Sequence, residues 1–170
     1  MLIYFIPLFL LALLAILENI KKFQNFIRQK YLFYFVSIIL IIFICFRYEI
    51  GCDWPAYENK FSLIKDSSIG YIFANQKQFF DIGYSIIAKL ISYKFNFSVL
   101  NIIYGLLFTI PLLFFVKNIK RSFLALMISY PYFIVVVGMG PLRQSAAIGF
   151  FMLCILNYIL KRKKLFYFYS

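Results

Sequence analysis

Long apolar runs separated by short polar segments dominate the chain. The runs cover residues 1–17, 31–46, 96–116, 122–137 and 145–160. A helix needs about 20 apolar residues to cross a bilayer, and lysine and tyrosine side chains that flank the shorter runs can supply the missing length by snorkelling or by tilt of the helix. The pattern therefore predicts an all-α fold, a polytopic transmembrane helix bundle with about five spans.

A sixth segment, residues 82–93, has a different pattern. Its apolar residues recur at helical spacing, whereas its other face is polar. The apolar positions are Ile82, Ile86, Ile87, Leu90 and Ile91, and the polar positions are Ser85, Lys89 and Ser92. Such a segment is typical of an amphipathic helix in the membrane interface. We therefore expect an interfacial or re-entrant helix at 82–93 and not a further span.

The distribution of lysine and arginine decides the topology. If 82–93 does not span, the basic segments 18–30, 117–121 and 161–164 all lie on one side of the membrane, and if it spans, the bias reverses between the two halves of the chain. Because basic residues gather on the cytoplasmic side, we expect the N-terminus outside and the C-terminus inside. The polar stretch 47–81 then forms an external loop.

Composition supports this interpretation and excludes other classes of protein. Hydrophobic residues make up 64% of the chain, against about 45–50% in soluble domains, so we expect residues 1–170 to form a single membrane domain. The net charge of +12 would suggest nucleic acid in a soluble protein. Here the lysines flank apolar runs, so we expect the lipid bilayer as a partner and no nucleic acid. The chain has no histidine, and its three cysteines lack metal-ligand spacing, so we expect no metal and no cofactor.

Two polar islands interrupt the apolar pattern. The first island is residues 46–57 and the second island is residues 138–145. Each places an arginine, Arg47 or Arg143, beside an apolar run of membrane length. A charge at such a position costs free energy and is a functional-site hypothesis by default. In the topology above, both islands face the same non-cytoplasmic compartment, where the two arginines can act on one anionic group.

The second island combines a helix N-terminus with a cation. Pro141 suits the first position of a helix and Gly140 the cap before it, which puts Arg143 in the first turn, where the helix dipole disfavours a positive charge. The N–H groups of a helix N-terminus bind anions, and a guanidinium matches phosphate through two bonds. Arg143 therefore either holds a phosphate, with Gln144 beside it, or contacts lipid headgroups or a nearby aspartate.

The first island offers carboxylates near a tight turn. Gly51 permits the turn, and Pro55 can open a short helix. Asp53 is then either the N-cap of that helix or, like Glu49, a base near the membrane surface. Asp81, which precedes the amphipathic segment, has the same kind of choice between a helix N-cap and a residue of the same external pocket.

The aromatic residues of the first island also have two interpretations. Tyr48, Trp54 and Tyr57 belong either to the belt of aromatics at a membrane interface or to a platform on which sugars stack. A carboxylate base, aromatic rings and two arginines beside a membrane suit glycosyl transfer from a lipid-linked diphosphate donor. The arginines would stabilise the departing diphosphate, and the carboxylate would take the proton from the acceptor hydroxyl.

Three motifs along the chain resemble a known family. They are Arg47-Tyr48-x-x-Gly51-x-Asp53-Trp54-x-x-Tyr57, Asp81-x-Gly83-Tyr84 and Pro141-Leu142-Arg143-Gln144-Ser145-x-Ala147. In this order they are similar to the pattern of EpsG/Wzy-type exopolysaccharide (O-antigen-like) polymerases. The resemblance implies a multi-pass enzyme of the bacterial inner membrane that polymerises undecaprenyl-diphosphate-linked oligosaccharide repeat units on the outer-leaflet side. It assigns diphosphate contact to Arg47 and Arg143, and pocket positions to Asp53 and Tyr57.

The motifs and the chemistry together predict one site. Its expected catalytic residues are Arg47, Asp53 and Arg143, and its expected substrate-binding residues are Glu49, Gly51, Trp54, Tyr57, Asp81 and Gln144. Family members are longer and usually carry a downstream histidine motif, so we expect a truncated N-terminal half, with a complementing C-terminal fragment or a chain-length regulator as partner. The alternatives are a transporter or flippase-like protein for lipid-linked sugars, an accessory membrane protein and an inactive fragment.

Overall fold

The computed structural model describes residues 2–20, 30–51, 53–75 and 81–160, and every regular element in these ranges is helical. The elements are α1 (Leu2–Asn19), α3 (Lys30–Cys45), α4 (Trp54–Asp66), α5 (Ile69–Ala74), α6 (Ile82–Ser92), α7 (Phe97–Lys117), α8 (Ser122–Ser129), η1 (Tyr130–Val137) and α9 (Leu142–Ile159). The all-α prediction is confirmed. The basic segments at 21–29 and 161–164, which the topology argument used, lie outside the described residues.

Each apolar run of the sequence forms helix, and the run at 122–137 is divided into α8 and the π-helix η1. The division falls beside Pro131, whose missing N–H interrupts the α-helical hydrogen-bond ladder. The stretch 47–81, which the sequence suggested as a loop, contains two helices, α4 and α5. The first of them carries Pro55 in its first turn, as the sequence predicted.

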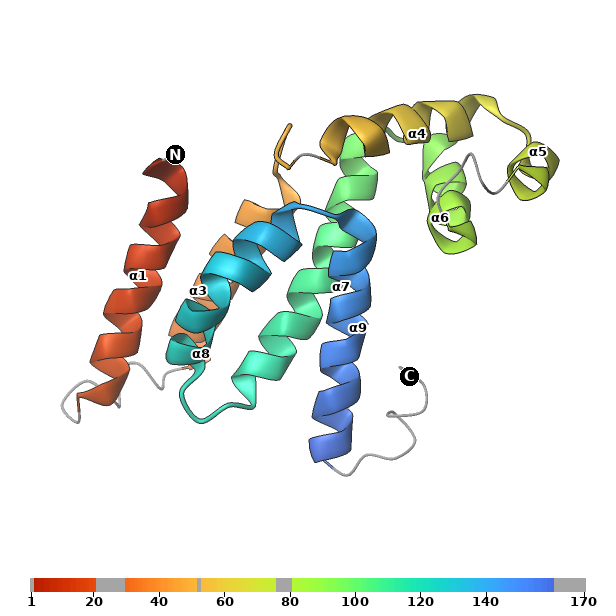
Figure 1. Ribbon diagram of the computed structural model, residues 1–170. Coiled ribbons are helices and arrows are strands. Elements are labelled where there is room, and N and C mark those ends of the chain that lie inside the picture. Colours follow the sequence, from red (N-terminus) through yellow and green to blue (C-terminus); the bar gives the residue numbers. More distant parts are fainter. Residues whose placement is uncertain (1, 21–29, 52, 76–80, 161–170) are drawn as a thin grey trace.

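The long helices form a bundle with two distinct ends (Figure 1). At the upper end of Figure 1, α3 and η1 end and α9 begins, whereas α1, α7 and α9 end at the lower end, where α8 begins. Helix α7 packs against both α3 and α9, and α1 packs against α8. Helix α4 lies across the upper end, with α5 and α6 beside it. Both polar islands therefore lie at the same end of the bundle.

Within the described residues, α7 and α9 are the helices long and apolar enough to cross a membrane, and α1, α3, α6 and the α8–η1 stretch are shorter apolar helices. Large apolar side chains are exposed on the bundle, including Phe9, Phe35 and Phe151. Exposed apolar surface of this extent is unfavourable in water. These faces suit contact with lipid hydrocarbon.

Helix α6 spans the segment that the sequence predicted as an amphipathic helix. Ser85, Ser92 and Ile91 are buried against the protein, whereas Ile82, Ile86 and Leu90 are exposed. The Ser92 hydroxyl bonds within the protein, because its Oγ donates to the carbonyl oxygen of Lys89 at 2.8 Å. The exposed apolar side chains are free to contact lipid. The position of 82–93 in the membrane interface stays a prediction.

Buried side chains form two clusters. The larger cluster joins α1, α3, α7, α8 and η1 along the length of the bundle. The smaller cluster joins α4, α5 and α6 to the first turns of α7 and α9 at the upper end. Its members include Trp54, Tyr57, Phe61, Tyr84, Phe97, Tyr104, Leu142 and Ala146. Packing of these side chains holds the first and second islands together at the upper end of the bundle.

Close packing of α7 against α9 depends on a proline and a glycine. Pro111 has no N–H, so the carbonyl of Leu107, one turn earlier, lacks its helical hydrogen bond. A Cβ on Gly149 of α9 would clash with that carbonyl oxygen and would lie 3.2 Å from Phe108 Cα. Only glycine therefore lets α9 cover the exposed carbonyl, as neighbouring helices do at prolines in membrane proteins.

Replacing Gly149 with alanine should force α7 and α9 apart and lower the free energy of unfolding by about 1–3 kcal/mol. Thermal unfolding in detergent micelles measures the loss. Gly70→Ala in α5 is the matched control, because no atom lies within 4 Å of a Cβ built there. That variant should be neutral or gain up to about 1 kcal/mol, and equal effects of the two variants would contradict the close-contact explanation.

Candidate functional site

The backbone of the first island makes a tight turn after α3. Glu49 has φ of 50° and Gly51 has φ of 95°, a left-handed conformation that favours glycine. A Cβ on Gly51 would lie 3.0 Å from the carbonyl oxygen of Met139 and 3.3 Å from Gly140 Cα. The absent side chain therefore lets the first island pack directly on the backbone of the second.

Arg47 connects the two islands with α7. Its side chain is buried, with 6% exposed. Nε donates to Oδ1 of Asn101 at 2.7 Å, and Nη1 donates to the carbonyl oxygen of Gly138 at 2.9 Å. Asn101 in turn donates through Nδ2 to the carbonyl oxygen of Cys45 at 3.0 Å. These bonds use two of the five guanidinium donors and tie α3, α7 and the second island together.

The charge of Arg47 persists in spite of its burial. Burial lowers the pKa of the guanidinium to about 10, which leaves it protonated at neutral pH. A buried cation needs oxygen acceptors around it, and Asn101 and Gly138 supply two. The upper end of the bundle therefore keeps a fixed positive charge beneath the second island.

Arg143 lies in the first turn of α9 and is more accessible. Its Nη1 pairs with Oδ2 of Asp81 at 2.5 Å, and the two side chains are 36% and 73% exposed. The helix begins one residue later than we expected, because Pro141 occupies the N-cap position and Leu142 is the first helical residue. Helix ends commonly shift by a residue. Of the interpretations left open, the structure has Arg143 paired with an aspartate.

Three tyrosines surround this ion pair, and we call them the tyrosine cluster: Tyr57 of α4, Tyr84 of α6 and Tyr104 of α7. All three are buried. The ring centroids of Tyr57 and Tyr84 are 5.6 Å apart and those of Tyr84 and Tyr104 are 5.9 Å apart. The Tyr84 hydroxyl donates to the carbonyl oxygen of Tyr57 at 3.3 Å. The cluster fixes α4 and α6 on α7.

Tyr57 links the two arginines. Its side chain has a hydrogen bond with Arg143 and an electrostatic interaction with Arg47. Both arginines therefore lie in the surroundings of one tyrosine, at the point where α3, α4, α7 and α9 converge. We call this group, consisting of Arg47, Tyr57, Asp81, Tyr104 and Arg143, the arginine site.

The two aspartates occupy N-cap positions without acting as side-chain caps. Asp53 precedes α4 and Asp81 precedes α6, and neither makes a side-chain hydrogen bond to the N-terminus of its helix. Asp81 instead pairs with Arg143. Asp53 lies between Gly51, which contacts the second island, and Tyr57, which contacts Arg143. Asp81 therefore belongs to the arginine site, and Asp53 lies on the chain segment that connects the turn of the first island to Tyr57.

The remaining predicted site residues differ in accessibility. Trp54 is buried, and its ring packs edge-on against Phe97 with centroids 5.0 Å apart, so it is not an open stacking platform. Tyr48 is exposed, and a hydrogen bond with Glu49 raises its pKa. Gln144 is exposed beside Arg143. Among the described residues, no group of three or more His, Cys, Asp or Glu side chains could hold a metal ion.

Sequence reasoning missed two members of the surroundings of the arginines, Asn101 and Tyr104. Both lie on α7 within a run that the sequence marks as apolar. A buried amide in such a run is itself a signal, because polar groups in membrane segments are costly. Tyr84 was noticed as part of a motif but was given no role.

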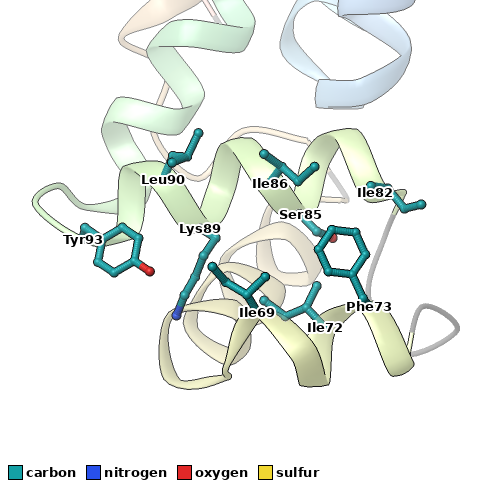
Figure 2. Close-up of a pocket in the computed structure, with 9 residues that line it drawn as sticks. All are labelled: Ile69, Ile72, Phe73, Ile82, Ser85, Ile86, Lys89, Leu90 and Tyr93. Atoms are coloured by element: carbon teal, nitrogen blue, oxygen red, sulfur yellow. The ribbon is translucent and has the colours of Figure 1, made fainter.

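An apolar cavity of about 240 Å³ lies between α5 and α6, away from the arginine site. Figure 2 shows Ile69, Ile72 and Phe73 of α5 pointing toward α6. Lys89 lines this cavity, but its Nζ donates to the carbonyl oxygens of Ile64, Lys65 and Ser67 at 3.2, 2.9 and 2.7 Å. The lysine therefore closes the C-terminus of α4 and does not present its charge to the cavity.

The apolar helices with lipid-suited surfaces and the arginine site at one end define the class: an all-helical membrane protein with a cationic site at the end of its bundle. The chain belongs to the EpsG family, whose model matches residues 30–170. Membership indicates a role of the polysaccharide-polymerase type in polysaccharide biosynthesis. No curated protein and no solved structure matches the chain.

Proposed function

We propose that the arginine site polymerises lipid-diphosphate-linked oligosaccharide repeat units into an exopolysaccharide or other surface polysaccharide at the non-cytoplasmic face of the bacterial membrane. The observation that carries the proposal is the junction of the two islands, in which Arg47 bonds to the carbonyl oxygen of Gly138 while Tyr57 has a hydrogen bond with Arg143 and an electrostatic interaction with Arg47. Two cations at the same end of the bundle, beside apolar helices, suit a diphosphate at the end of a lipid.

The two arginines have different parts in this proposal. Arg143, at the accessible rim, contacts the diphosphate directly and stabilises the charge that develops as it leaves. Arg47 is buried and positions the second island. Its charge therefore stabilises the diphosphate from within the protein, without direct contact. Asp81 holds Arg143 in the absence of the donor and separates from it when the diphosphate arrives.

The reaction transfers a sugar from the lipid diphosphate to the hydroxyl of an acceptor sugar. The acceptor oxygen forms a bond to the anomeric carbon of the donor, the bond from that carbon to the diphosphate oxygen breaks, and the diphosphate leaves with the electron pair. Asp53 accepts the hydroxyl proton as general base. Diphosphate is a weak base, so its departure requires no acid.

The proposed topology has about five spans, with the N-terminus outside and the C-terminus inside. The shared position of both islands at the upper end of the bundle supports it. In a background without cysteine, a cysteine at the exposed position Glu58 of α4 should react with a membrane-impermeant maleimide from outside. A cysteine at Lys120, between α7 and α8, should react only after the membrane is opened. Equal labelling of both from outside would overturn the topology.

Elongation by the protein reconstituted in liposomes tests the reaction. With an undecaprenyl-diphosphate-linked oligosaccharide, polymer length on a gel should increase with time. Asp53→Asn should slow elongation about 10²–10⁴-fold, as the loss of a general base does. Asp66→Asn, at the exposed C-terminal end of α4, should leave the rate unchanged. Unaltered elongation in Asp53→Asn removes the base role, and donor binding without any elongation by the unaltered protein favours a transporter or accessory protein.

A further inference from the structure

A groove runs along the outer side of α7 and α9, below the arginine site. It has a volume of about 320 Å³, and its walls are Ile103, Leu106, Leu107, Ile110 and Pro111 of α7 with Phe150 and Leu153 of α9. None of these side chains carries a charge or a hydrogen-bonding group. The groove belongs to α7 and α9, the two helices of the described residues that are long and apolar enough to cross a membrane.

Helical periodicity relates the groove to Arg143. Phe150 follows Arg143 by seven residues on α9, which is about two turns and about 10 Å along the same face. On α7, Leu107 and Pro111 follow Tyr104 by one and two turns, and Tyr104 has electrostatic interactions with Arg143 and Asp81. The groove therefore lies on the same two helices as Tyr104 and Arg143, within about two turns of them.

The environment of the groove restricts its occupant. Ile110 is 44% exposed and Phe150 is 40% exposed, so the walls face outward from helices that suit a bilayer. In hydrocarbon, a polar chain along this wall would lose its hydrogen bonds to water without replacement. An occupant that also reaches Arg143 needs an anionic group at one end and an apolar chain at the other.

We propose that this groove binds the first isoprene units of a polyprenyl chain whose diphosphate lies at Arg143. The inference rests on the proposed function, and it adds a lipid site to the sugar-transferring site. A diphosphate carries more negative charge than the phosphodiester of a bilayer lipid and matches a guanidinium through two bonds. The pairing of this charge with Arg143 selects the polyprenyl diphosphate over the surrounding phospholipids. The groove then sets the direction in which the donor enters the site.

Photo-crosslinking to the reconstituted protein tests the groove without requiring turnover. The probe is undecaprenyl diphosphate with a diazirine in the isoprene unit next to the diphosphate. Mass spectrometry should find the cross-links on α7 between 103 and 111 and on α9 between 150 and 153. Excess unlabelled undecaprenyl diphosphate should abolish them, and excess phosphatidylglycerol should not. Cross-links spread over α1, α3 and α8, or equal competition by phosphatidylglycerol, would overturn the proposal.

Filling the groove provides a second, independent measurement. Leu106→Trp and Leu153→Trp should each weaken undecaprenyl diphosphate binding about tenfold and leave the binding of inorganic diphosphate unchanged. Ile128→Trp, at an exposed apolar position of α8, is the matched control and should change neither. If the tryptophan variants bind undecaprenyl diphosphate as tightly as the unaltered protein does, the groove is not the binding site of the polyprenyl chain.

These measurements separate the two proposals. Cross-links in the groove without any elongation would remove the polymerase function and leave a polyprenyl diphosphate site. Elongation with cross-links elsewhere would keep the polymerase and remove the groove.

Discussion

Replacing Arg47 with alanine is expected to lower the free energy of unfolding by about 2–4 kcal/mol. The variant leaves two buried acceptors, Asn101 Oδ1 and the carbonyl oxygen of Gly138, without their partner, and each unsatisfied buried group costs about 1–3 kcal/mol. The second island also loses its attachment to α3. Thermal unfolding in detergent micelles measures the loss, and elongation should fall with it.

Two comparisons sharpen this prediction. Arg121→Ala, at an exposed arginine between α7 and α8, should change the free energy of unfolding by less than about 0.5 kcal/mol. Arg47→Lys keeps the charge but lacks the planar fork that reaches Asn101 and Gly138 together, so its stability should be intermediate. An Arg47→Ala protein as stable as Arg121→Ala would mean that the buried bonds do not hold the islands together.

Replacing Arg143 with alanine is expected to slow elongation about 10²–10³-fold, as the loss of one charge-stabilising donor does. The fold should survive, because the pair with Asp81 is partly exposed and such pairs contribute less than about 1 kcal/mol. Arg143→Lys should recover part of the rate. The measurements are the elongation rate in liposomes and the unfolding temperature of the same preparation.

Asp81→Asn is the informative partner of this variant. In the structure Asp81 occupies the guanidinium that the diphosphate is proposed to use. Removing the carboxylate charge should therefore leave undecaprenyl diphosphate binding as tight as before or tighter, whereas Arg143→Ala weakens it. Equal weakening in both variants would show that the ion pair itself, and not the arginine, binds the donor.

The sequence predicted the helices well because each long run of apolar side chains must satisfy its backbone hydrogen bonds internally. It also predicted that Pro55 opens a helix, since proline fits the first turn. The start of α9 was placed one residue early, because both Gly140 and Pro141 are compatible with an N-cap position.

The different states of the two arginines could not be read from the sequence. Arg47 and Arg143 both stand at the end of an apolar run, yet one is buried and the other is paired at the rim. The difference depends on Asn101, which meets Arg47 only because α3 packs against that face of α7. Which face of α7 meets which neighbour is a tertiary property.

The orientation of α6 has the same origin. The hydrophobic pattern shows that Ser85 and Ile86 lie on different faces, but not which face meets the protein. In the structure Ser85 is buried, whereas Ile82, Ile86 and Leu90 are exposed, an arrangement that suits contact with hydrocarbon.

The covering of the Leu107 carbonyl by Gly149 has a consequence for how a bulky donor enters. Because Gly149 has no side chain, α7 and α9 cannot slide past one another without exposing that oxygen to lipid. The two helices therefore form a rigid pair, and we expect a donor to enter by displacing the exposed salt bridge between Asp81 and Arg143 and not by separating α7 from α9.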